Sequence, residues 1–67
     1  METFGERLRR LREENKMYQE SVAEKMGVAI SSVSCWERDK FEPDIEKLIT
    51  LADLFGVSLD YLLAGRM

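Results

Sequence analysis

The chain has 67 residues, of which 45% are hydrophobic and 34% are charged, with one cysteine and no histidine. This size and composition predict one folded domain over residues 1–67, and they argue against a disulfide-stapled secreted scaffold and a zinc site. The sequence carries no cofactor fingerprint, so we expect no cofactor. Without histidine, and with a single cysteine, no acid–base or nucleophilic constellation can be assembled, so we do not expect an enzyme.

Charge is distributed unevenly along the chain. The net charge is −3, with 8 basic and 8 acidic groups in residues 1–40 but 2 and 5 in residues 41–67. This total lowers the expectation of nucleic-acid binding without excluding it, because a small face can be positive on an acidic protein. No apolar run approaches the roughly 20 residues of a membrane span, and residues 1–12 are too charged for a signal peptide. We therefore expect no membrane partner. Because the single cysteine cannot form a disulfide within the chain, we expect a location in the reducing cytoplasm.

Apolar residues at helical spacing predict a first helix near the N-terminus. Phe4, Leu8 and Leu11 form a single stripe with the period of an α-helix. Thr3 followed by Glu6 is a capping box, which places the start of this helix at Thr3.

A second helix is predicted from about Gln19 to Met26 and a third from about Ile30 to Arg38. Gly27 suits the left-handed conformation that ends a helix, and very few residues separate it from the third helix. Two short helices joined this closely must cross steeply, which is the helix-turn-helix geometry, here over residues 19–38. Such a crossing needs a small residue, a turn residue and inward apolar residues. We assign these structural roles to Ala23, Gly27, Val28, Val33 and Trp36, with Val22 and Met26 also facing inward.

Two further helices are predicted after residue 43. Asp44 can cap a fourth helix that Gly56 ends, and Ser58 can cap a fifth helix with Gly65 after it. The apolar faces comprise Ile45, Leu48, Leu51, Ala52 and Phe55 in the fourth helix and Leu59, Leu62 and Leu63 in the fifth. No stretch alternates with a period of two over the length of a strand, so the predicted class is all-α, with five helices around one core.

Several strings in the chain resemble a known family. They are Phe4-Gly5-Glu6-Arg7-Leu8, Gly27-Val28, Val33-Ser34-Cys35-Trp36-Glu37-Arg38 and the run from Leu51 to Leu63. Together they resemble the phage-repressor and Cro-like helix-turn-helix proteins, the xenobiotic-response-element class of bacterial transcriptional regulators. The resemblance implies a compact five-helix lambda-repressor-like domain. It also implies a sequence-specific regulator that binds double-stranded DNA as a repressor-type homodimer on an inverted-repeat operator.

The resemblance assigns DNA contacts to particular residues. In this family the second helix of the motif lies in the major groove, and its outward residues meet base edges. The residues at base-contact positions are Ile30, Ser31, Ser34 and Cys35. The residues at phosphate-contact positions are Gln19, Arg38 and Lys40. Arg12 and Glu37 stand where the family often has a structural ion pair; the alternative is that both are solvated charges.

The chain departs from the family pattern around the same face. Ala29 stands where serine or threonine is common, and Asp39 stands where glycine is usual. Ile30 and Cys35 replace polar or basic side chains with apolar ones. Tyr18 and Ala29 leave the second and third helices without their best N-caps. The apolar face keeps an alternative function open, that of a protein-interaction module or antitoxin-like binder of an unidentified partner protein.

A dimer is expected because two half-sites about one helical turn apart multiply weak contacts. Candidate interface residues are exposed ones near the fourth and fifth helices, with Phe55, Leu59 and Tyr61 as the choices. We expect the chain to be entirely DNA-binding domain, without a separate effector domain, so that regulation acts through concentration, dimerisation or a partner.

Overall fold

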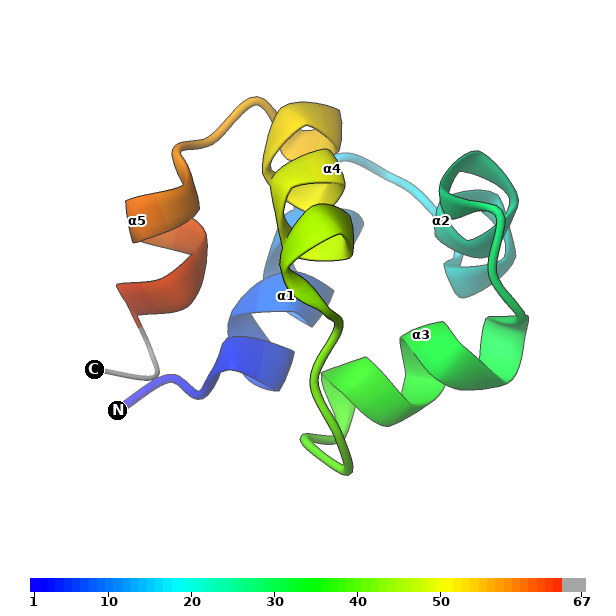
Figure 1. Cartoon of the computed structure of the whole chain (residues 1–67), viewed down its shortest axis with the longest axis horizontal. Coiled ribbons are helices and arrows are strands. Elements are labelled where there is room, and N and C mark those ends of the chain that lie inside the picture. Colours follow the sequence, from blue (N-terminus) through cyan, green and yellow to red (C-terminus); the bar gives the residue numbers. More distant parts are fainter. Residues whose placement is uncertain (65–67) are drawn as a thin grey trace.

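The computed structural model describes residues 1–64, and five helices make up most of this part of the chain (Figure 1). They are α1 (Phe4–Glu14), α2 (Gln19–Met26), α3 (Ile30–Glu37), α4 (Ile45–Phe55) and α5 (Leu59–Leu63). No strand is present among the described residues, so the predicted all-α class with five helices is confirmed. None of the helices in this range is long and apolar enough to cross a bilayer.

Three helices begin at the caps that the sequence predicts. The Thr3 hydroxyl accepts from the Glu6 N–H, and the Glu6 carboxylate accepts from the Thr3 N–H, which completes the capping box of α1. The side chain of Asp44 caps α4, and that of Ser58 caps α5. These oxygens satisfy N–H groups that have no partner inside the helix.

The other two helices begin without a side-chain cap. Neither Tyr18 at the start of α2 nor Ala29 at the start of α3 makes a capping hydrogen bond, as predicted. Gly27 ends α2 in the left-handed region, with φ at 68°. α3 ends one residue earlier than predicted, and Arg38 is its C-cap. Gly65, predicted to follow α5, lies outside the described residues.

One core lies between the five helices. Its buried apolar residues are Phe4, Leu8, Leu11, Val22, Ala23, Val33, Trp36, Leu48, Leu51, Ala52, Phe55 and Leu62. Met26 and Val28 are partly buried and pack against this core. The assignment of Ile45 to the inner face of α4 is wrong, since its side chain is 65% exposed. Ile45 is the first residue of α4 and lies at the edge of the buried stripe.

The expectation that Phe55 is exposed, on which its choice as an interface residue depended, is also wrong. Phe55 belongs to the core, while Leu59 is partly buried and Tyr61 is exposed. Tyr61 is engaged within the domain, because its hydroxyl accepts from Arg10 Nη2 at 2.7 Å and the Arg7 guanidinium lies over its ring. These contacts join α5 to α1.

The two helices of the predicted motif occupy one side of the molecule. α3 packs against both α1 and α2, and α4 packs against α5. In Figure 1, α2 and α3 lie at the right, α5 lies at the left and α4 lies between them. α3 therefore lies at the edge of the fold, with Val33 and Trp36 buried on the core side and Ile30 and Ser31 exposed to solvent.

Candidate nucleic-acid interface

The turn between α2 and α3 is built by backbone conformation and close packing. A Cβ at Gly27 would meet no atom within 4 Å, so glycine is favoured there by its positive φ and not by lack of space. The Val28 N–H donates to the Ala23 carbonyl, which closes the end of α2. Ala23 and Val33 are buried, and this packing fixes the direction in which α3 leaves the turn.

One side of α3 takes no part in the core. Ile30 is 46% exposed and Ser31 is exposed, whereas Ser34 and Cys35 are half-buried. The spacing of these four residues along a helix brings them to the same side, which we call the outer face of α3. All four residues predicted to contact bases therefore lie together, and none of the four carries a charge.

The two predicted phosphate-contact cations follow the outer face. Arg38 and Lys40 are both exposed. The Arg38 side chain turns back over the last turn of α3, where its Nε donates to the Ser34 carbonyl at 3.4 Å and its Nη2 lies 3.8 Å from Cys35 Sγ. The guanidinium thus lies next to the outer face, where it can meet an anion beside that surface.

The third predicted phosphate-contact residue is turned toward the protein. Gln19 is half-buried, and its side-chain amide donates to Glu37 Oε1 at 3.0 Å. One amide N–H is therefore engaged within the domain. Tyr18 supplies no side-chain cap for the first backbone N–H groups of α2.

Arg12 and Glu37 form the ion pair considered from the sequence. Arg12 Nε and Nη2 donate to the two Glu37 carboxylate oxygens at 2.6 and 3.1 Å, and Arg12 Nη1 donates to the Met17 carbonyl at 2.9 Å. Only 12% of the Arg12 side chain and 3% of the Glu37 side chain are exposed. The hydrogen bonds to Glu37 raise the pKa of Arg12 above its usual value. With Gln19, this pair links α1, α2 and the end of α3.

Sequence reasoning missed a second link at the end of α3. Asp39 adopts a positive φ of 57°, which is uncommon for a residue other than glycine. Its carboxylate accepts from the Thr3 hydroxyl at 2.6 Å and from the Gly5 N–H at 2.9 Å. The available signal was an aspartate at a position where glycine is usual, together with a glycine inside the first predicted helix.

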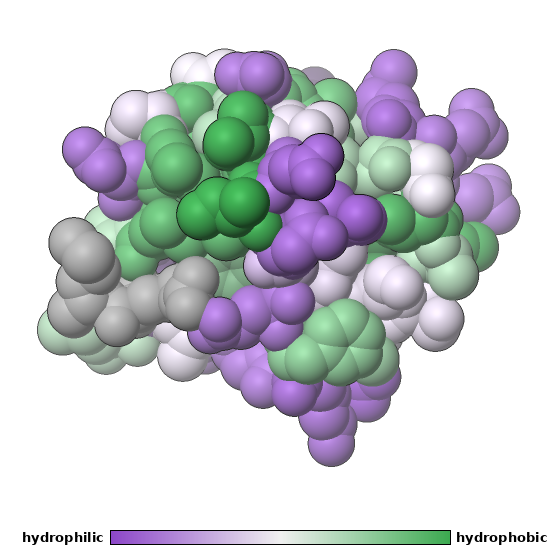
Figure 2. Space-filling view, viewed as in Figure 1, coloured by the Kyte–Doolittle hydropathy of each residue, from purple (hydrophilic) through white to green (hydrophobic). Residues whose placement is uncertain are grey.

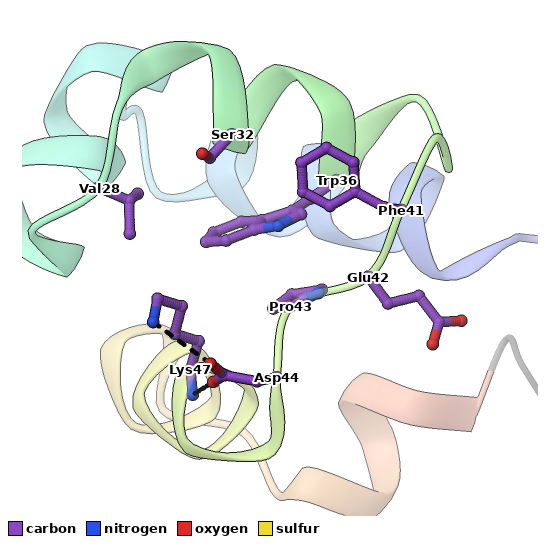
Figure 3. Close-up of a pocket in the computed structure, with 8 residues that line it drawn as sticks. All are labelled: Val28, Ser32, Trp36, Phe41, Glu42, Pro43, Asp44 and Lys47. Carbon is purple, nitrogen blue, oxygen red and sulfur yellow. Dashed lines mark hydrogen bonds and ion pairs between the residues drawn. The ribbon is translucent and has the colours of Figure 1, made fainter.

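A groove of about 280 Å³ opens between α3 and α4. Figure 3 shows the rings of Trp36 and Phe41 on one side of it and Lys47 and Asp44 on the other. Across residues 1–64, no group of three or more His, Cys, Asp or Glu side chains is arranged to hold a metal ion. Figure 2 shows apolar surface over α4, where Ile45 and Ile49 are 65% and 48% exposed.

The chain matches the helix-turn-helix domain family over residues 5–66. It belongs to this family. The uncharacterized HTH-type transcriptional regulator YobD of Bacillus subtilis is 45% identical over 60 residues, which are 90% of this chain and 54% of that protein. Repressor protein C2 of Salmonella phage P22 is 38% identical over 64 residues, which are 96% of this chain and 30% of that protein. The chain thus spans about half the length, or less, of these curated relatives.

Solved structures resemble the whole domain. The P22 c2 repressor in complex with a synthetic operator matches with a TM-score of 0.90 at 37% identity, over 97% of this chain and 98% of that one. SinR, described as the master regulator for biofilm formation, in complex with DNA matches with a TM-score of 0.81 at 33% identity, over 90% and 97%. The predicted resemblance to phage-repressor helix-turn-helix proteins is confirmed.

Proposed function

We propose that this chain is the DNA-binding domain of a transcriptional regulator, which recognises a double-stranded operator by inserting the outer face of α3 into the major groove. The observation that carries the proposal is the exposed side of α3, which the core does not use and which lies beside Arg38 and Lys40. The similarity to a repressor structure that contains an operator supports the same assignment. A helix presented in this way fits the width of the major groove. Its partner would be DNA in the cytoplasm.

The chemistry of the outer face suggests how bases would be read. Ile30 can pack on the methyl group of a thymine, and the hydroxyls of Ser31 and Ser34 can donate to or accept from base edges. Arg38 and Lys40 would neutralise phosphates. Because these are only two cations per protomer, we expect a shallow dependence of affinity on salt, with a slope in log–log form of about −2 per protomer.

A homodimer on an inverted repeat is the second part of the proposal. A single domain with two cations and base contacts made only by apolar groups and hydroxyls would bind weakly, and the two copies of a dimer would add their contacts. Sedimentation of the protein with a duplex that contains an inverted repeat should give two protomers per duplex. One protomer per duplex at saturation would contradict the dimer.

Selection from a randomised duplex pool at about 100 mM salt, a concentration at which phosphate contacts alone are weakened, tests the DNA-binding function. We expect an inverted repeat to be enriched. Ile30→Glu should abolish binding to the selected duplex, because it places a carboxylate against the DNA. Ile49→Glu is the matched control, since Ile49 on α4 has nearly the same exposure, 48% against 46%. Equal losses in both variants would contradict the assignment of the interface to α3.

The apolar surface favours one alternative function. Ile45 and Ile49 on α4 are 65% and 48% exposed, and Ile30 on α3 adds a third exposed apolar side chain. A protein partner could cover such surfaces. If the folded protein enriches no duplex, a pull-down that compares Ile30→Glu with Ile49→Glu would locate the surface that a partner uses.

A further inference from the structure

Asp39 joins the end of α3 to the start of α1. It lies between Arg38 and Lys40, and its carboxylate accepts hydrogen bonds from Thr3 and Gly5, which are 36 and 34 residues away in the sequence. The contact with the Thr3 hydroxyl is 2.6 Å long, within the range of charge-assisted O–H···O bonds. Thr3 accepts at the same time from the Glu6 N–H, so the carboxylate extends the cap of α1.

The backbone at Asp39 indicates why this residue type matters. Its φ of 57° lies in the left-handed region, where glycine is unstrained and a side chain adds a conformational cost. Aspartate tolerates this region better than most residues, and here its carboxylate lies at the positive end of the α1 dipole. The conformation brings both carboxylate oxygens within reach of donors on α1.

Gly5 allows the two helices to approach closely enough for this link. A Cβ at Gly5 would lie 2.5 Å from the Glu37 carbonyl oxygen and 2.7 Å from the Trp36 carbonyl oxygen. The absence of a side chain therefore lets the end of α3 rest directly on the first turn of α1. The Gly5 N–H then points at Asp39, at 2.9 Å.

We propose that Asp39 is a positioning residue for DNA binding: it fixes the loop after α3 on α1, so that Arg38 and Lys40 are held ready for the phosphates. The proposal rests on the function proposed above. It makes a prediction opposite in sign to simple electrostatics. A carboxylate between two cations repels DNA, so its removal alone would tighten binding. If Asp39 positions those cations, its removal weakens binding, because the loop must then be ordered at the moment of association.

The test uses the full chain and the duplex obtained by selection. Asp39→Gly removes the carboxylate and accepts the left-handed backbone without strain, so the variant should stay folded. We expect its affinity for the selected duplex to fall about tenfold and the salt slope to become shallower by about one. Arg38→Ala should weaken the wild type but have little further effect in the Asp39→Gly background. Asp39→Asn removes the same charge but keeps an oxygen for the Gly5 N–H, and we expect it to recover much of the affinity.

The outcomes separate this inference from the proposed function. If wild-type protein enriches no duplex, the proposed function fails and the inference fails with it. If wild-type protein binds its duplex, but Asp39→Gly binds equally or more tightly with an unchanged salt slope, only the role of Asp39 is overturned. Additive effects of Asp39→Gly and Arg38→Ala would overturn it as well. Circular dichroism at the assay temperature establishes that each variant is folded. Should Asp39→Gly be unfolded, Asp39→Asn decides alone: binding tighter than wild type overturns the inference, and binding equal to or weaker than wild type, as expected for a variant that keeps part of the link, supports it.

Discussion

Gly5 and Gly56 are constrained for different physical reasons. A Cβ on Gly5 would collide with backbone carbonyl oxygens. A Cβ on Gly56 would meet no atom within 4 Å, but a residue with a side chain would have to adopt the φ of 65° found there. The restriction at Gly5 depends on where α3 lies, so local sequence does not reveal it, whereas the restriction at Gly56 belongs to its own backbone and accompanies its position at the end of α4.

We expect Gly5→Ala to destabilise the fold by about 1–3 kcal/mol or more, since α3 must move away from α1 to admit the methyl group. Gly56→Ala should cost about 1 kcal/mol, which is the conformational penalty without a collision. Urea denaturation of both variants measures the difference. A loss at Gly5→Ala no larger than that at Gly56→Ala would contradict the close contact between α1 and α3.

Ala29 offers a stabilising substitution at the start of α3. Its backbone has the extended conformation of an N-cap, with φ at −72° and ψ at 150°, but no side chain accepts from the first-turn N–H groups. Ala29→Ser supplies that acceptor and should stabilise the protein by about 0.5–2 kcal/mol. Thermal unfolding measures the gain. Ala29→Val, which offers no oxygen, is the control and should give no gain; an equal rise in both variants would contradict capping as the cause.

At the scale of elements, the Arg12–Glu37 pair connects α1 to α3 in a nearly buried site. Its side chains are 12% and 3% exposed, in contrast to the Arg9–Glu13 pair, whose side chains are 64% and 56% exposed. A buried carboxylate left without its cation is costly, while an exposed pair is screened by solvent. The two pairs should therefore behave very differently in double-mutant cycles.

Arg12→Ala should destabilise the fold by about 3–5 kcal/mol, because it leaves Glu37 buried without its cation. Arg12→Ala and Glu37→Ala together should cost less than the sum of the single changes. The same cycle on Arg9 and Glu13 should give a coupling below about 1 kcal/mol. Urea denaturation of both sets of variants checks this expectation. Additive losses at Arg12 and Glu37 would contradict an energetic coupling between the two side chains.

The N-cap of α4 makes stability depend on acid pH. The backbone N–H of Lys47 donates to the Asp44 carboxylate and lowers its pKa below the ordinary 3.8. A lowered pKa in the folded state stabilises the protein above the unfolded value, and this contribution is lost as the pH falls through the folded value. Asp44→Asn keeps an acceptor oxygen but cannot titrate there. We expect its melting temperature to fall less than that of wild type between about pH 5 and pH 3; an equal fall would contradict the linkage.

The helices could be predicted because their signals are local. Thr3, Asp44 and Ser58 act on N–H groups within three residues of themselves, and Gly27 acts on its own backbone. The link between Asp39 and α1 could not be predicted in this way, since it joins residues more than 30 positions apart. Local pattern predicts where a helix begins and ends, but it does not determine which helix ends meet.

Side-chain direction limited the prediction of the candidate site. The spacing along α3 correctly placed Ile30 and Ser31 on an exposed face, because helical period alone decides that. Gln19 shares its helix with other exposed positions, yet its amide turns inward to Glu37, a partner that sequence spacing does not indicate. Ile45 fits the apolar period of α4, but at the first helical position no neighbouring element buries it.

At the scale of the whole molecule, one small core supplies most of the stability. Domains have a free energy of unfolding of about 0.05–0.15 kcal/mol per residue, which gives about 3–10 kcal/mol for this chain. Leu51 is fully buried among the helices, so Leu51→Ala should cost about 2–5 kcal/mol and leave the domain marginally folded. Ile49→Ala, on the exposed side of the same helix, should change stability by less than about 1 kcal/mol. Urea denaturation that gave equal losses would contradict the assignment of the core.

Trp36 gives the molecule an intrinsic optical reporter. It is the single tryptophan of the chain, 2% exposed, and its ring lies beside the groove between α3 and α4 (Figure 3). Its emission therefore arises at the junction of these helices and should shift to longer wavelength when water reaches the indole. Because the indole faces away from the outer face of α3, a ligand on that face would not touch it. Fluorescence can thus follow the folding of an unlabelled protein separately from the occupancy of the candidate interface.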